Sequence, residues 1–416
     1  METKKMLYPA GEPPGSQRKG MTDVSGYGAR LAGFSPTEEL PDYFLKPDGS
    51  RVSSPGEWEE QRVFLKRMLS DMMFGHLPPA PRRVEDEIVE RGEWYAGAAY
   101  HETVRLTADG RLSLLVEVTR PKAAGKFPVF IWNQFAQMER CPVEEEACRL
   151  GYAIVSFDRT RLAPDEEGAS AFDGGAFGCA YPESDARAVG IWGWGHSLVA
   201  SWLIGMEWAD SKALIAVGHS RGGKAAFWAA AYDERIAVCA ASGSGCGGGG
   251  CFRWMGGRLG QGVGVSESLG DLTRKDRFWY WYADRLAQFG NRHGGGELLH
   301  EVQLPFDCHT LRALVAPRAV ICVEGLDDTW SNGYGTQVGW RAGEEVYRFL
   351  GREGANALAF FEGGHEFTAP RWKAVLDFCE TTLRGRPQKL QYRRFAPQEA
   401  PVPPLHYSWR APGMPD

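Results

Sequence analysis

The residues best suited to chemistry lie in a Gly-x-Ser-x-Gly pentapeptide that runs from Gly218 to Gly222, with Ser220 at its centre. An apolar, β-prone run at residues 213–217 precedes it, and an alanine-rich segment typical of a helix follows. A serine hydroxyl is a weak nucleophile, so hydrolases hold it on a tight strand-to-helix turn where a base can reach it. Glycines at the two ends leave room for the strand and helix to approach. The pattern predicts that Ser220 is the nucleophile of an α/β-hydrolase.

The base is expected late in the chain, because α/β-hydrolases order their triad as serine, acid and histidine. Of the nine histidines, His365 has the right position, directly after the last expected strand at residues 357–361 and before a C-terminal helix. The others precede the acid candidates, adjoin the nucleophile or lie in the proline-rich tail. We therefore predict that His365 is the general base.

The acid of the triad is expected after the preceding strand, at residues 319–323, where three carboxylates follow: Glu324, Asp327 and Asp328. A carboxylate at this position can accept the imidazole N–H, set its tautomer and stabilise the cation that forms during the reaction. Asp328 is our first choice, and Asp327 and Glu324 remain alternatives.

Two basic residues follow the nucleophile. The backbone N–H of Arg221 lies at the start of the expected helix, where the helix dipole favours an anion, and its guanidinium adds a charge-assisted donor. Both can stabilise an oxyanion. Lys224 lies one helical turn beyond Ser220 and can face the same cleft, although the same spacing also suits a lysine on a solvated helix face.

Composition narrows the possible partners. The 416-residue chain has a net charge of −6 without a block of like charge, which argues against nucleic acid or an anionic membrane as a partner. No apolar run approaches the roughly 18 residues of a membrane span.

The first residues lack the apolar core of a secretory signal, so we expect a cytoplasmic protein or a secreted one whose signal was removed. The nine cysteines include no Cys-x2-Cys pair, so a zinc site of the usual spacing is not expected. We expect that the protein needs no metal or other cofactor. We also expect it to be a monomer.

Periodicity predicts three regions: an irregular and helical N-terminal wrap at 1–90, a catalytic domain at 91–390, and a proline-rich tail at 391–416. The wrap contains a helix at 57–74 whose expected inward residues are Trp58, Val63, Leu65, Met68 and Met72. The catalytic domain reads as a hairpin at 101–118, strands at 128–132, 152–156, 213–217, 237–241, 319–323 and 357–361, and helices at 144–150, 191–208, 341–350 and 371–384. This alternation predicts an α/β fold, the three-layer α/β-hydrolase sandwich with a mostly parallel central sheet.

The segment from Gly218 to Lys224 resembles the Gly-x-Ser-Arg-x-Gly-Lys elbow of carbohydrate esterase family 15, the glucuronoyl esterases, and of its bacterial type. Further similar segments lie at residues 191–195, 244–248, 304–318, 328–330 and 363–365. The resemblance implies a serine carboxylester hydrolase of the 4-O-methyl-glucuronoyl methylesterase type, which cleaves esters between glucuronic acid on xylan and lignin alcohols through an acyl-enzyme. It also implies that Arg221 assists the oxyanion, and that Lys224, Trp330 and Glu267 contact the sugar.

The chain departs from the family pattern at two places. Many members have a glutamate directly before the Ser-Gly-x-Gly-Gly motif, where this chain has Gly243, and this difference favours Asp328 as the acid. Some fungal members have a disulfide between positions that hold His219 and Glu366 here, so that bond cannot form. The alternatives are a promiscuous or acetyl-xylan-type carbohydrate esterase and, from another class, a non-catalytic polysaccharide-binding protein. The substrate expected is a small-molecule or oligosaccharide ester.

Overall fold

The computed structural model describes residues 37–166, 175–255, 266–274, 276–290, 300–390 and 405–413. Expectations for the first 36 residues of the N-terminal wrap, and for most of the proline-rich tail, lie outside the described residues.

Nine strands among the described residues form one sheet, in the order β1-β2-β3-β5-β4-β6-β7-β8-β9. The strands are β1 (Val84–Trp94), β2 (Ala99–Ala108), β3 (Leu112–Pro121), β4 (Phe127–Gln134), β5 (Ala153–Asp158), β6 (Ala209–His219), β7 (Ile236–Ser242), β8 (Ala319–Gly325) and β9 (Asn356–Phe361). The strands β1, β2, β3 and β5 pair with their neighbours in an antiparallel manner. The strands β5, β4, β6, β7, β8 and β9 follow in that order and pair in parallel. The predicted α/β fold with a mostly parallel sheet is confirmed.

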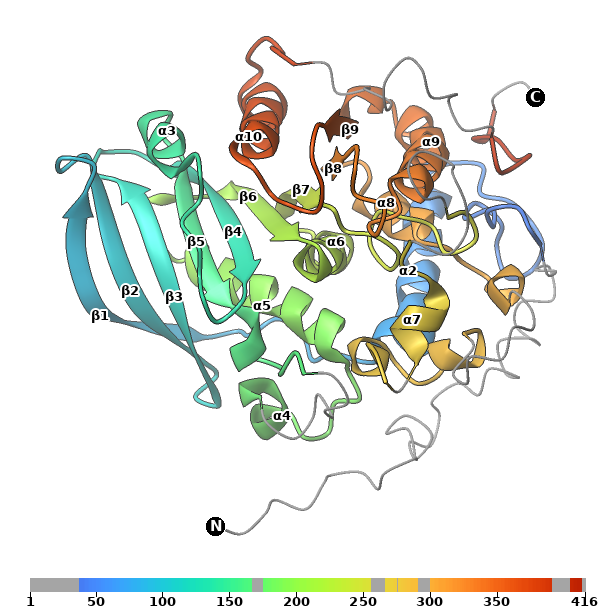
Figure 1. Cartoon of the computed structure of the whole chain (residues 1–416), viewed down its shortest axis with the longest axis horizontal. Coiled ribbons are helices and arrows are strands. Elements are labelled where there is room, and N and C mark those ends of the chain that lie inside the picture. The colour runs from blue at the N-terminus through green and yellow to red at the C-terminus, as the bar shows by residue number, and fades with distance from the viewer. Residues whose placement is uncertain are drawn as a thin grey trace.

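Helices cover both faces of the sheet. The α-helices of the described residues are α2 (Pro55–Leu69), α3 (Glu144–Arg149), α4 (Ala176–Ala180), α5 (Ala188–Leu203), α6 (Arg221–Tyr232), α7 (Leu269–Thr273), α8 (His309–Val315), α9 (Gly333–Phe349) and α10 (Ala369–Arg384). In Figure 1, α3 and α10 lie on one face, and α5 and α6 pack together on the other. Because both faces are covered, the interior strands β4, β5 and β8 are buried along their whole length, which explains their continuous apolar sequences.

The helix predicted at 57–74 is α2 followed by one π-helical turn at Ser70–Phe74. Trp58, Leu65, Met68 and Met72 are buried as expected. Val63 was wrongly placed inward, because its side chain is 69% exposed. It lies five residues after Trp58, which turns it about 140° away from the buried face of a helix with 3.6 residues per turn.

Several other elements also differ from the sequence expectation, and helix α9 begins at Gly333 rather than at 341. Helix α5 ends at Leu203 rather than at 208, because the chain turns at Gly205 before it enters β6. Strand β1 was not predicted, since its residues are exposed along both faces and show no apolar alternation. It is a charged edge strand, a common way to prevent edge-to-edge association. Strand β1 spans residue 90, the predicted boundary between the N-terminal wrap and the catalytic domain. The division of the chain into these regions stays a prediction.

Candidate active site

Ser220 occupies a sharp turn between β6 and α6. Its backbone has φ 55° and ψ −126°, a conformation that non-glycine residues adopt only when the surrounding structure enforces it. Its N–H donates to the Ser242 carbonyl at 2.8 Å, which ties the turn to the end of β7. This strand-turn-helix arrangement is the nucleophile elbow of α/β-hydrolases.

The glycines of the pentapeptide are needed for this turn. A Cβ on Gly218 would lie 2.0 Å from the Gly222 carbonyl oxygen, and a Cβ on Gly222 would lie 2.5 Å from Asn133 Oδ1. Asn133, at the end of β4, donates to the Gly222 and Val217 carbonyls at 3.0 and 3.1 Å. The close approach predicted from the glycines is confirmed, and Asn133 is a contact that the sequence analysis missed.

Asp328 and His365 meet at the carboxyl ends of β8 and β9. His365 Nδ1 lies 2.6 Å from Asp328 Oδ2, where the carboxylate is 2% exposed and the imidazole 35% exposed. Burial acts to raise the pKa of Asp328, but hydrogen bonds from His365 and Ser331 outweigh it and hold the pKa below the usual range. Among the described residues, Ser331 is also within hydrogen-bond distance of His365 Nδ1, at 2.8 Å.

The two alternative acids have different surroundings. Asp327 is exposed, and its backbone N–H donates to the Gly363 carbonyl at 3.0 Å. Glu324 is fully buried at the end of β8, and neither of its carboxylate oxygens has a hydrogen-bond partner among the described residues. Burial raises the pKa of Glu324 well above its usual value, so a protonated, neutral Glu324 suits this environment.

His219, directly before the nucleophile, packs against His365 with ring centroids 4.7 Å apart. Its Nδ1 lies 3.3 Å from Ser242 Oγ. Burial lowers the pKa of His219 to about 3. A neutral imidazole therefore forms one wall of the histidine site.

Arg221 begins α6, and its guanidinium is paired with a carboxylate that the sequence analysis missed. Its Nη1 lies 3.2 and 3.1 Å from the two oxygens of Asp165, whose side chain is buried. The guanidinium also lies over the Trp281 ring, 4.6 Å from the centroid. Asp165 accepts further hydrogen bonds from Tyr280 Oη and Trp281 Nε1, each at 3.1 Å. Little in the sequence indicates this role for Asp165, because the residue lies in a loop, seven residues after the end of β5.

Lys224 and Glu267 form a buried pair, with side chains 2% and 3% exposed and Nζ 2.5 Å from Oε2. Lys224 Nζ also donates to the Ser244 and Cys246 carbonyls, at 2.7 and 2.6 Å, so its three protons all have protein acceptors. The Glu267 N–H donates to the Trp330 carbonyl at 2.9 Å. The structure thus brings the expected sugar-contacting residues Lys224 and Glu267 together and joins them to the backbone of Trp330, which lies two residues after Asp328.

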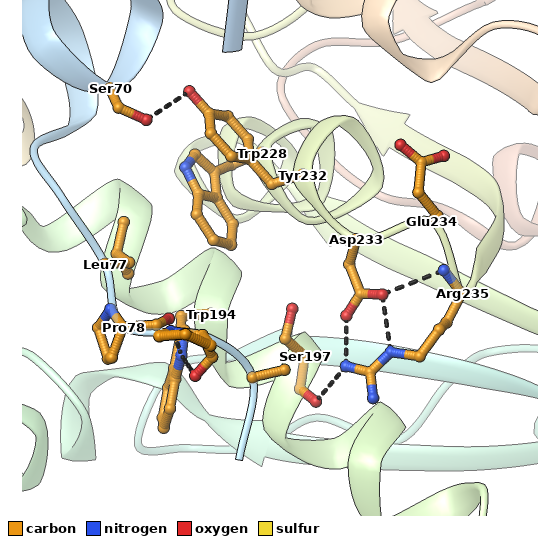
Figure 2. A pocket seen from close by; sticks show the side chains of 12 residues that line it. Ser70, Leu77, Pro78, Trp194, Ser197, Trp228, Tyr232, Asp233, Glu234 and Arg235 are labelled. Carbon is orange, nitrogen blue, oxygen red and sulfur yellow. Dashed lines mark hydrogen bonds and ion pairs between the residues drawn. The ribbon is translucent and has the colours of Figure 1, made fainter. Parts of the chain in front are cut away.

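A cavity of about 450 Å³ lies elsewhere, at the far end of α6 (Figure 2). Its walls include Trp194, Trp228 and Tyr232, with Asp233 and Arg235 joined by an ion pair beside them. Ser220 and Tyr232 lie at opposite ends of this helix, about 18 Å apart at 1.5 Å per residue. This cavity is therefore separate from the nucleophile.

Within the described ranges, no group of three or more His, Cys, Asp or Glu side chains is arranged to hold a metal ion. No helix in the part of the chain that the structure describes is long and apolar enough to cross a membrane. Each of the nine cysteines is present as a thiol. The expectation of a monomer stays a prediction.

Comparison with known proteins shows to which family the chain belongs. A family model described as glucuronyl esterase of fungi matches residues 104–351, which is more than half of the chain. The chain belongs to this family. The glucuronyl esterase match includes Ser220 and Asp328, and it ends before His365. The resemblance to carbohydrate esterase family 15 is confirmed.

Similar proteins come from prokaryotes and fungi. The carbohydrate esterase MZ0003 from an unknown prokaryotic organism is 23% identical over 84% of this chain and 91% of its own length. A 4-O-methyl-glucuronoyl methylesterase of Podospora anserina is 27% identical over 74% of this chain and 58% of its own. Among solved structures, a carbohydrate esterase family 15 glucuronoyl esterase from Caldicellulosiruptor kristjansonii has a TM-score of 0.71 and 28% identity, covering 87% of this chain and 95% of that one.

Proposed function

We propose that this member of the glucuronyl esterase family hydrolyses esters of glucuronic acid through a covalent acyl-enzyme on Ser220. The observation that carries the proposal is the 2.6 Å contact between Asp328 Oδ2 and His365 Nδ1. The His365 ring packs against His219, the residue before Ser220, whose φ is +55°. A carboxylate on Nδ1 selects the tautomer whose Nε2 lone pair can accept the serine proton. The names of the fungal relatives, 4-O-methyl-glucuronoyl methylesterases, support the substrate class.

The proposed reaction has two steps. Ser220 Oγ attacks the ester carbonyl while His365 takes its proton, and the tetrahedral anion collapses as His365 returns that proton to the leaving alcohol. Water, activated by the same imidazole, then releases the glucuronic acid and restores Ser220. We assign the oxyanion to the Arg221 backbone N–H and guanidinium. A second N–H is expected from the loop that begins at Phe135 after β4.

We propose that the cluster of Lys224, Glu267 and Trp330 recognises the sugar. Glu267 is an acceptor for sugar hydroxyls, and the Trp330 indole offers an apolar wall with a donor. Because the ammonium of Lys224 is bound by three protein oxygens, it acts first to hold Glu267 in its buried position. Burial acts to raise the pKa of Glu267, and Lys224 opposes that rise.

The test compares benzyl glucuronate with p-nitrophenyl acetate. A glucuronoyl esterase turns over benzyl glucuronate with the larger kcat/KM, whereas a promiscuous or acetyl-xylan-type esterase favours the acetate. Ser220→Ala is expected to lose hydrolysis of both. Unchanged hydrolysis in this variant would refute the serine mechanism, and binding of glucuronoxylan without hydrolysis by the wild type would favour a binding protein.

The acid is tested separately, in single-turnover assays of Asp328→Ala and Asp327→Ala. We expect Asp328→Ala to lower the rate of acylation at least about a thousandfold, since loss of a triad carboxylate costs on the order of 10⁴. Asp327→Ala, on the adjacent exposed carboxylate, is the matched control and is expected to stay near the wild-type rate. The reverse pattern would refute the assignment of Asp328.

A further inference from the structure

Ser331 lies three residues after Asp328 and completes a small triangle with the acid and the histidine. Its Oγ is 2.5 Å from Asp328 Oδ2 and 2.8 Å from His365 Nδ1, and the Asp328–His365 side measures 2.6 Å. The Ser331 N–H donates to the other carboxylate oxygen, Oδ1, at 3.0 Å. Ser331 is 1% exposed, so these contacts are made without competition from solvent.

The proton count at this triangle sets the direction of each hydrogen bond. In the tautomer that accepts the Ser220 proton, His365 Nδ1 carries a hydrogen and is a donor. The Ser331 hydroxyl has one hydrogen, and the charged oxygen at 2.5 Å is a stronger acceptor than the Gly243 carbonyl at 3.1 Å. Ser331 therefore donates to Asp328 and offers its own lone pair to the His365 Nδ1–H.

Gly243 provides the space for this arrangement. Its φ is +50°, and a Cβ built on it would lie 3.2 Å from Ser331 Oγ, 3.3 Å from Asp328 Oδ2 and 3.3 Å from His365 Cε1. A longer side chain at this position would enter the triangle. Two neighbouring positions therefore accommodate Asp328, which follows β8. Gly243, directly after β7, leaves space beside the carboxylate, and Ser331, two residues before α9, supplies a hydroxyl.

We propose that Ser331 is a positioning residue of the hydrolysis reaction, which holds the Asp328 carboxylate and the Nδ1–H tautomer of His365 in their reactive orientation. This proposal rests on the proposed function, since it acts through the triad assigned there. Both carboxylate oxygens of Asp328 receive a hydrogen bond from Ser331, one from its N–H and one from its hydroxyl. A carboxylate bound at both oxygens cannot rotate away from the imidazole.

The experiment compares Ser331→Ala with Ser184→Ala on benzyl glucuronate. Ser184 is a matched control, because it is also buried and its hydroxyl donates to one backbone carbonyl, that of His76 at 2.7 Å. We expect Ser331→Ala to lower kcat about ten- to a hundredfold, as for loss of a hydrogen bond to a charged group. KM is expected to change less than about twofold, and Ser184→Ala to leave both constants near the wild type.

Two further readouts separate positioning from a general structural effect. If Ser331 acts through the acid, adding Ser331→Ala to Asp328→Asn lowers kcat less than it does in the wild type; equal factors would overturn the proposal. In proton NMR, the far-downfield signal of the His365 Nδ1–H is expected to shift in Ser331→Ala and to stay in Ser184→Ala. An unchanged signal together with unchanged kcat would also overturn it.

Ser331→Thr, which keeps the hydroxyl, is the second variant if Ser331→Ala does not fold. It is expected to retain the downfield signal, and loss of that signal in a folded Ser331→Thr would contradict the proposal. If the wild type hydrolyses no ester, the proposed function is refuted but the position of Ser331 can still be tested. The NMR comparison needs no substrate, so its failure is distinguishable from failure of the proposed function.

Discussion

Arg221 and Asp165 form an ion pair directly after Ser220 in the chain, with Arg221 Nη1 3.1 Å from Asp165 Oδ2. A cation at the first position of a helix is unfavourable, because the N-terminal end of the helix dipole is positive. The buried carboxylate offsets this cost and fixes the direction of the guanidinium. Tyr280 and Trp281 hold the carboxylate in turn, so side chains from two other segments of the chain hold the arginine next to Ser220.

The first prediction concerns this pair. Asp165→Asn keeps the shape of the side chain but removes its charge, so Arg221 loses the contact that orients it. We expect kcat on benzyl glucuronate to fall about ten- to a hundredfold, as for loss of one preorganised oxyanion donor. Tyr280→Phe removes one hydrogen bond to Asp165 and leaves its charge, so we expect a fall of less than about threefold. An Asp165→Asn variant that is folded by circular dichroism and has wild-type kcat would contradict this role.

A second prediction concerns the buried pair of Lys224 and Glu267. Removing one partner leaves the other charge buried without compensation, which costs about 3–5 kcal/mol. We therefore expect Lys224→Met to lower the free energy of unfolding by that amount in urea titrations. Combining it with Glu267→Leu should cost less than the sum of the single changes, with a coupling of at least about 1 kcal/mol. Strict additivity would mean that the two side chains do not depend on each other.

A third prediction uses two glycines with similar backbones. Gly243 and Gly351 have φ of +50° and +66°, but a Cβ on Gly243 would approach Ser331, Asp328 and His365, whereas a Cβ on Gly351 would have nothing within 4 Å. Both alanine variants should lose about 1 kcal/mol of stability from the left-handed backbone. Gly243→Ala alone is expected to lower kcat, by about tenfold or more if the triad shifts by a few tenths of an ångström. Equal kinetics for the two variants would show that the space at Gly243 is not needed.

A fourth prediction is a pH dependence of stability at His76. Its Nε2 lies 2.8 Å from Asp71 and its Nδ1 3.2 Å from Asp185. Arg67 lies 4.0 Å from the first of these carboxylates and Arg285 3.7 Å from the second. The hydrogen bonds that His76 donates to the carboxylates of Asp185 and Asp71 raise its pKa from 6.5 to about 9. The folded protein therefore keeps a proton that the unfolded chain releases above pH 6.5.

The sign follows from linkage. The stabilisation from His76 is fully present below pH 6.5 and is lost as the pH rises through about 9. Because the ring is 38% exposed, solvent weakens the effect, and we expect wild type to exceed His76→Gln by about 1–2 °C in Tm at pH 6. Melting curves from pH 5.5 to 9.5 should show this difference shrinking toward pH 9. A difference that grows with pH would contradict the ion pairs.

Much of the architecture could be predicted because its signals are local. The strands on both sides of Ser220 are continuous apolar runs, as expected for a parallel sheet covered on both faces. The order of Ser220, Asp328 and His365 along the chain follows from the fold once the elbow is recognised. Strand β1 gave no such signal, because both of its faces are in solvent and its partner β2 rather than its own pattern makes it a strand. Val63 was misplaced because apolar character alone does not show which way a helical residue points.

The sequence by itself predicted a nucleophile, a base and three candidate acids, since each lies at a fixed place relative to a strand end. Only the tertiary structure decided which carboxylate meets His365, because Glu324, Asp327 and Asp328 all carry a carboxylate and differ in where the fold places it. It alone revealed the contacts of Asp165 with Arg221 and of Ser331 with His365, which join residues 56 and 34 positions apart along the chain. Such contacts form where loops from different strands converge, and no local pattern of residues encodes that convergence.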